Sequence, residues 1–158
     1  MLRILLASLA GLLAAGVLAA TAAAQTTYAL NGIEVNEDPA TFVGSVAGGG
    51  TWWAVVQHDT LNKTGTTDIT GGSFAIYPYH AHRVRGTITG GELVAGAPVA
   101  GLFGTCRQDF ALSGAGDVAG GGAASFSGTL RHFGTWTDAS HTECDAFAAS
   151  VHLDVTIS

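Results

Sequence analysis

The chain has 158 residues, of which 47% are hydrophobic and only 11% are charged, and its formal net charge is −6 at pH 7. Charged residues make up roughly 25% of an average soluble domain, so uncharged polar side chains must cover most of this protein's surface. An acidic chain without a cluster of basic residues does not neutralise phosphates, so nucleic acid is excluded as an expected partner.

The N-terminal segment has the composition of an export signal. Arg3 supplies a positive charge, an uncharged apolar stretch follows it, and an Ala-x-Ala motif ends at Ala24. Signal peptidase recognises small residues at these positions. An uncleaved anchor is the alternative, but the apolar stretch is at the short end of what spans a bilayer. We therefore predict a cleaved signal peptide over residues 1–24, and a secreted or periplasmic domain over 25–158 that is free of the membrane.

Beyond the signal segment, short runs of β-branched and aromatic residues alternate with glycine clusters, a pattern typical of strands and turns. The predicted strands are 27–35, 41–46, 51–58, 73–77, 80–89, 99–103, 107–113, 124–132 and 146–157. The predicted turns are 48–50, 71–72, 90–91, 114–119 and 120–122. Eight or nine antiparallel strands indicate a single all-β domain, either a barrel or a sandwich.

Alternation along these strands predicts which side chains face the core. In the last strand, Phe147 and every second residue after it are apolar, whereas the residues between them are small or polar, so His152 is expected to face solvent. The same rule places Trp52 in the core and Trp53 on the opposite face. It also places four histidines on apolar faces: His58, His80, His82 and His132.

His80 and His82 form a His-x-His pair, and two imidazoles that point the same way from a strand can bind one metal ion. With His58 or His132 as a third ligand, the set predicts a zinc or copper site with an open position. Pro78 precedes the pair, and a bulge there would reverse both side chains. The alternative for these residues is a buried histidine that is hydrogen-bonded to a backbone carbonyl or to a threonine.

Cys106 and Cys144 are the only cysteines. In an exported protein, such a pair predicts a disulfide rather than a metal site. Two free buried thiols are the alternative. The chain-entropy estimate for a loop of this length gives the bridge a stabilising effect of about 4 kcal/mol.

Motifs of covalent catalysis are missing from the sequence. No Gly-x-Ser-x-Gly segment occurs, and both cysteines are assigned to the bridge. Glu34, Glu37 and Asp38 lie in a polar stretch before a proline, and we interpret them as a solvated loop rather than as an acid–base pair. The sequence therefore favours a non-catalytic protein, with a metalloenzyme as the alternative.

Aromatic side chains outside the predicted core favour binding. We expect Trp53, Tyr77 and Tyr79 to contact a ligand, because an exposed indole or phenol stacks on a sugar ring or anchors a partner protein. Coverage by a loop or by the second sheet is the alternative for Trp53. The sequence thus predicts a binding or structural module for a small apolar or sugar-like ligand, or for a partner protein. Its alanine-rich and lysine-poor composition is typical of bacteria.

Overall fold

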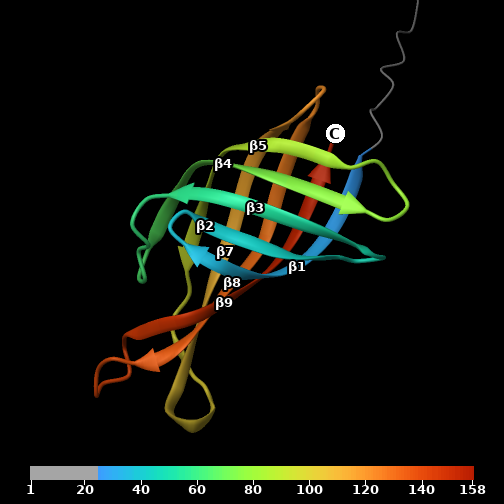
Figure 1. The fold of residues 1–158 in the computed structure, drawn as a ribbon. Coiled ribbons are helices and arrows are strands. Elements are labelled where there is room, and N and C mark those ends of the chain that lie inside the picture. Colours follow the sequence, from blue (N-terminus) through green and yellow to red (C-terminus); the bar gives the residue numbers. More distant parts are fainter. Residues whose placement is uncertain (1–24) are drawn as a thin grey trace, which may run out of the picture.

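The computed structural model describes residues 25–158, and the predicted signal peptide lies outside them. The described chain forms strands and one short 3-10 turn, η1 (Leu102–Gly104) (Figure 1). The strands are β1 (Thr26–Glu37), β2 (Ala40–Val46), β3 (Gly50–His58), β4 (Thr66–Pro78), β5 (Val84–Ala95), β6 (Val99–Ala100), β7 (Thr105–Val118), β8 (Ala123–Trp136) and β9 (Cys144–Ile157).

All strand pairings are antiparallel, and two of them close the sheet. β1 pairs with β9, and β5 pairs with β7, so eight strands form a closed up-and-down barrel. The ninth strand, β6, is a two-residue addition beside the part of β7 that extends past β5. The predicted all-β fold is confirmed, and the choice between barrel and sandwich resolves to a barrel. Closure leaves the barrel without a long free edge.

Inward-facing apolar side chains pack inside the barrel, as alternation predicts. Trp52 is 3% exposed, and its indole donates a hydrogen bond to the Asn31 carbonyl at 3.0 Å. Phe74 and Phe126 meet edge to face, with ring centroids 5.1 Å apart. Phe147 departs from the prediction, because β9 carries a register shift beside it, and this side chain is 66% exposed.

Three of the predicted glycine turns lie inside strands instead. Residues 71–72 belong to β4 and residues 90–91 to β5, and Gly72 pairs with Ile88 while Gly91 pairs with Ile69. A Cβ on Gly72 or on Gly91 would overlap a backbone carbonyl of the neighbouring strand, so glycine is needed there for close approach. The segment 114–119 lies largely within β7. These glycines therefore allow the barrel strands to pack closely rather than to reverse direction.

The two ends of the barrel differ in their connections. At what we call the short-turn end, brief turns join β2 to β3, β4 to β5 and β7 to β8. The predicted turns 48–50 and 120–122 are confirmed there, and their glycines adopt positive φ. At the opposite, long-loop end, longer connections follow β3, β5 and β8, and the hairpins that include η1 and the start of β9 project beyond the barrel (Figure 1).

The predicted disulfide between Cys106 and Cys144 is confirmed, with a Cα–Cα distance of 5.8 Å. Both cysteines are buried. Cys106 lies at the start of β7 and Cys144 at the start of β9, on either side of β8. The bridge therefore ties three neighbouring strands together at the long-loop end. Such a disulfide is typical of oxidising, extracytoplasmic compartments.

Candidate functional site

A cavity of about 560 Å³ opens at the long-loop end of the barrel, and we call it the mouth. Its volume lies within the range of roughly 300–1,000 Å³ that is common for small-molecule sites. Its floor is apolar and includes Phe42, Val56, Ile69, Leu93, Leu112 and Leu130. Its wall and rim carry charged and imidazole side chains, namely Glu34, Glu37, Asp38, His58, Lys63, His132 and Asp145.

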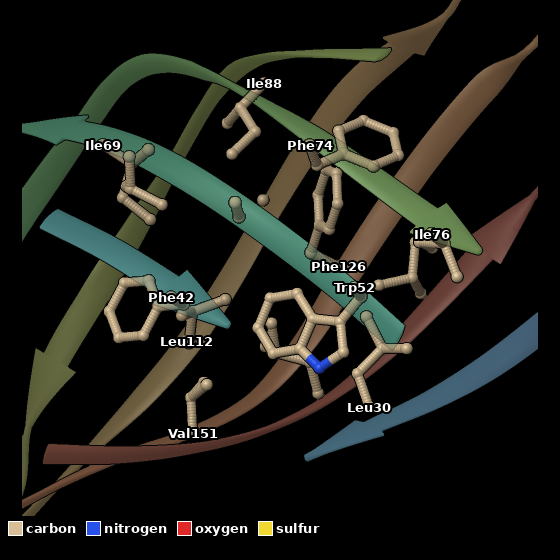
Figure 2. Close-up of a pocket in the computed structure, with 15 residues that line it drawn as sticks. Leu30, Phe42, Trp52, Ile69, Phe74, Ile76, Ile88, Leu112, Phe126 and Val151 are labelled. Atoms are coloured by element: carbon tan, nitrogen blue, oxygen red, sulfur yellow. The ribbon is translucent and has the colours of Figure 1, made fainter. Parts of the chain in front are cut away.

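A narrower cavity of about 40 Å³ lies deeper in the barrel and is lined by apolar residues (Figure 2). Figure 2 shows the indole of Trp52 in its wall, with Phe74 and Phe126 on a second side. Phe42 and Leu112 line both this cavity and the mouth. The barrel therefore offers a polar opening that narrows into an apolar interior.

Glu34 faces the mouth because it continues the inward row that starts with Leu30 on β1. Burial raises the pKa of its carboxyl group above the ordinary value, Glu37 adds to this effect, and His58 opposes it. No hydrogen bond or ion pair to this carboxylate is found within residues 25–158. Glu34 is thus a half-buried carboxylate that faces a cavity without a partner.

The interpretation of Glu34, Glu37 and Asp38 as one solvated loop is wrong for the first of them. β1 extends to Glu37, so Glu34 and Glu37 both belong to a strand. Glu34 is half-buried, whereas Glu37 and Asp38 are exposed. Strand alternation could have identified Glu34, since it lies four residues after a core leucine on the same face. A polar residue in an inward row is the signal that was missed.

His58 and His132 face the mouth, as alternation predicts. Burial lowers the pKa of His132, and the Lys63 ammonium lowers it further, so this imidazole is neutral at pH 7. Its ring centroid lies 5.0 Å from that of Phe110. His58 Nδ1 lies 2.6 Å from the carbonyl oxygen of Asp59. Because a carbonyl only accepts, Nδ1 donates, and the neutral ring has its lone pair at Nε2.

The loop between β3 and β4 (residues 59–65) is anchored beside the mouth. Leu61 packs against the core cluster and also lines the cavity. The buried side-chain amide of Gln108 donates hydrogen bonds to the carbonyls of Lys63 at 2.6 Å and Gly96 at 2.9 Å. One glutamine on β7 therefore fixes two loops of the long-loop end. The sequence alone gave no sign of this, since the partners are far apart along the chain.

Lys63 is the one basic residue among those that line the mouth. Its ammonium lies 3.6 Å from a carboxylate oxygen of Asp145 and 4.0 Å from one of Glu143. Glu143 lies in the loop between β8 and β9, and Asp145 lies near the start of β9. The charge of Lys63 is therefore already balanced by acidic neighbours, and the mouth has an excess of negative charge.

The four histidines of the predicted metal site do not come together, because they lie at opposite ends of the barrel. β4 ends at Pro78, which lacks an amide hydrogen, so His80 and His82 lie exposed in the turn at the short-turn end. Their predicted inward orientation is wrong. His58 and His132 lie at the other end, in the mouth. In the described part of the chain, no three histidine, cysteine or acidic side chains gather closely enough to hold a metal ion.

The predicted aromatic contacts do not line either cavity. Trp53 and Tyr77 lie half-buried on the outer face of the barrel, where they flank Ala75, which is completely buried. The guanidinium of Arg85 donates a hydrogen bond to the Tyr77 hydroxyl at 3.2 Å and lies 5.8 Å from its ring centroid. Tyr79 is 75% exposed in the turn after β4. Trp53 and Tyr77 therefore cover the barrel wall.

His152 faces outward, as predicted. It is exposed on β9, and its Nδ1 lies 2.7 Å from the side-chain oxygen of Asn31 on the neighbouring strand β1. This contact belongs to the outer surface of the barrel and not to the mouth.

Comparison with protein-family models, with curated proteins and with solved structures gives no match for this chain. Within residues 25–158, no helix is long and apolar enough to cross a membrane.

Proposed function

We propose that this protein binds one small, predominantly apolar ligand inside the barrel, and that the ligand enters through the mouth at the long-loop end. The observation that carries this proposal is the cavity of about 560 Å³, whose apolar floor adjoins a second apolar cavity. Eight-stranded barrels are either filled by side chains or just wide enough for one small ligand. An open, apolar-floored mouth supports the second arrangement.

The apolar walls set the expected dependence on ligand size. Each methylene group that leaves water contributes about 0.8 kcal/mol, which corresponds to roughly a fourfold gain in affinity. Affinity for a series of linear alcohols should therefore rise with chain length until the cavity is filled. A protein with a purely structural role would show no saturable binding.

We also propose that the protein acts outside the cytoplasm, in a secreted or periplasmic form. The buried bridge between Cys106 and Cys144 supports an oxidising compartment. The signal-like N-terminal segment adds to this from the sequence. Mass spectrometry of exported material should then find Gln25 as the first residue, and an exported protein that begins at Met1 would contradict cleavage.

The test of binding uses N-phenyl-1-naphthylamine, an uncharged apolar dye that fluoresces when it leaves water. We expect saturable binding with one dye per barrel. Leu112 lines both cavities, so Leu112→Trp should block the passage and weaken binding by about tenfold or more. The neighbouring Ala111 is exposed on the outer face of the same strand, and Ala111→Trp is the matched control that should bind normally.

Two further measurements keep this test decisive. Circular dichroism should show that Leu112→Trp retains the strand content of the barrel. Where that variant does not fold, Leu130→Phe narrows the same mouth with a smaller change in volume. Absence of saturable dye binding, or equal loss of binding in both tryptophan variants, would overturn the proposal.

A further inference from the structure

We infer that the polar group of the ligand is an amine, which the mouth binds as an ammonium ion beside Glu34 while the apolar part of the ligand occupies the barrel. This inference rests on the proposed function, because it assigns the ligand chemistry of the same cavity. It follows from the charges, the depth and the acceptor atoms of the mouth.

The charges of the mouth favour a cation. Four carboxylates line it, and Lys63 is the one basic residue among the lining residues. Lys63 already contacts Asp145 in the mouth and Glu143 beside it. Glu34, Glu37 and Asp38 form no ion pair with a lysine or arginine in the described part of the chain. A cavity lined by one sign of charge attracts the opposite sign and repels the same sign, so anionic ligands are disfavoured.

The depth of Glu34 distinguishes it from the other two carboxylates. Glu37 and Asp38 are exposed at the rim, whereas Glu34 is half-buried and lies opposite Phe42 in the pairing of β1 with β2. Phe42 lines both the mouth and the deeper cavity. Glu34 thus lies where the apolar wall begins. An ammonium beside Glu34 would place an attached apolar chain along Phe42 and toward the interior.

Glu34 also lacks the hydrogen-bond donors that usually compensate a carboxylate removed from water. A partly desolvated carboxylate without a partner gains more from a cation than an exposed carboxylate does, because the local dielectric constant is lower. The ammonium of a ligand would supply both the charge and the N–H donors. A carboxylate or phosphate ligand would instead need a free basic side chain.

The imidazoles of the mouth provide further acceptors for N–H groups. His132 is neutral at pH 7, and a neutral imidazole carries one acceptor nitrogen. The hydrogen bond from His58 Nδ1 to the Asp59 carbonyl leaves the acceptor of its neutral ring at Nε2. A primary ammonium has three N–H donors, which one carboxylate and the neighbouring acceptors can share. An alcohol has a single donor and therefore fits this set of acceptors less well.

Competition with the bound dye at pH 7.5 tests this inference with three probes of equal chain length: 1-aminodecane, 1-decanol and decanoic acid. We expect the amine to bind about tenfold more tightly than the alcohol, and the acid to bind most weakly. Glu34→Gln should remove the advantage of the amine and leave the affinity for decanol within about twofold. Asp154→Asn removes a charge on the exposed outer face of β9 and should preserve the advantage.

The pH dependence gives a second readout. The groups that share the mouth with Glu34 are Glu37 and Asp38 on the β1–β2 hairpin, His58 on β3, Lys63, His132 on β8 and Asp145 on β9. Protonation of Glu34 removes its charge, and protonation of His132 adds repulsion, so amine affinity should fall between pH 7.5 and pH 5. The fall should be smaller in Glu34→Gln, and decanol affinity should stay level.

The outcomes separate this inference from the proposed function. Equal binding of the three probes, or tightest binding of decanoic acid, would overturn the amine inference while the apolar binding site stands. An equal pH-dependent fall in the original protein and in Glu34→Gln would also overturn the role of Glu34. Failure of the dye and of every probe to bind would overturn the proposed function itself.

Discussion

The two ends of the barrel are built from the same strands, yet they differ in their side chains and in their connections. On β1, the inward row leads from Leu30 in the core to Glu34 in the mouth, and on β8 it leads from Phe126 to His132. At the short-turn end, glycine turns hold the hairpins tightly. At the long-loop end, a disulfide, a buried glutamine and ion pairs hold longer connections around an open cavity.

This difference shows how one closed sheet combines an apolar core with a polar-rimmed cavity. Packing of apolar side chains needs only a continuous row of inward-facing apolar residues. The part of each strand nearer the short-turn end supplies this row. The proposed ligand site needs polar groups that face an open cavity, and the last inward positions of β1, β3 and β8 place Glu34, His58 and His132 there. Substitutions at the two ends of a single strand should therefore have unequal effects.

The largest expected effect comes from the core position of β8. Phe126 is buried and meets Phe74 edge to face, so Phe126→Ala should destabilise the protein by about 3–5 kcal/mol. His132→Ala, farther along the same strand, leaves most of the apolar packing in place and should cost less than about 1 kcal/mol. Urea unfolding measures both. Similar losses for the two variants would contradict the proposal that the core end supplies stability and the mouth supplies ligand recognition.

Alternation along the strands predicted much of the fold, because the period of two is a local property of extended backbone. It identified the inward position of Trp52 and the outward position of His152, and it placed His58 and His132 correctly in the interior. Closure through β5–β7 and β1–β9 is a long-range pairing, which no local pattern encodes. The choice between barrel and sandwich therefore had to await the structure.

The wrong predictions concern segments whose structure depends on the neighbouring backbone and not only on their own residue pattern. Alternation holds only within a continuous strand, and Pro78 ends β4 before His80 and His82, so their apparent inward position has no meaning. The glycine clusters 71–72 and 90–91 look like turns, but they permit close approach between strands. That need depends on the partner strand, which the sequence does not identify.

Only part of the mouth was predictable. His58 and His132 follow from alternation, and Glu34 could have followed from the same rule. Lys63 and Gln108 could not, because their roles depend on contacts between a loop and a strand that lie far apart in the chain. Side chains that shape a cavity through loop anchoring are determined by the tertiary arrangement.

The second effect concerns the disulfide, which holds the long-loop end. Replacing Cys106 and Cys144 together by alanine should lower the free energy of unfolding by about 2–4 kcal/mol, which lowers the melting temperature by roughly 10 °C in a domain of this size. Because the bridge lies beside the mouth, dye binding should weaken in this double variant. Free thiols in denatured, unreduced protein would contradict the bridge, and unchanged dye binding would contradict its role in shaping the mouth.

The smallest expected effect lies in the pH dependence of stability, where two groups of the mouth act in opposite directions. The folded state lowers the pKa of His132 from 6.5, so the unfolded state binds more protons near that pH, and stability falls as the pH drops through this region. The folded state raises the pKa of Glu34 from 4.5, so it binds more protons than the unfolded state, and stability rises as the pH drops through its folded pKa.

Substitution separates these two contributions. His132→Gln removes the loss of stability on acidification, so the free energy of unfolding should fall less between pH 7.5 and pH 5 than in the original protein. Glu34→Gln removes the opposing gain, so the fall should become steeper, while stability at pH 7.5 should increase because a half-buried charge is gone. Urea unfolding at both pH values measures each slope. If the two variants changed the slope in the same direction, burial in the mouth would not be the cause of these pKa shifts.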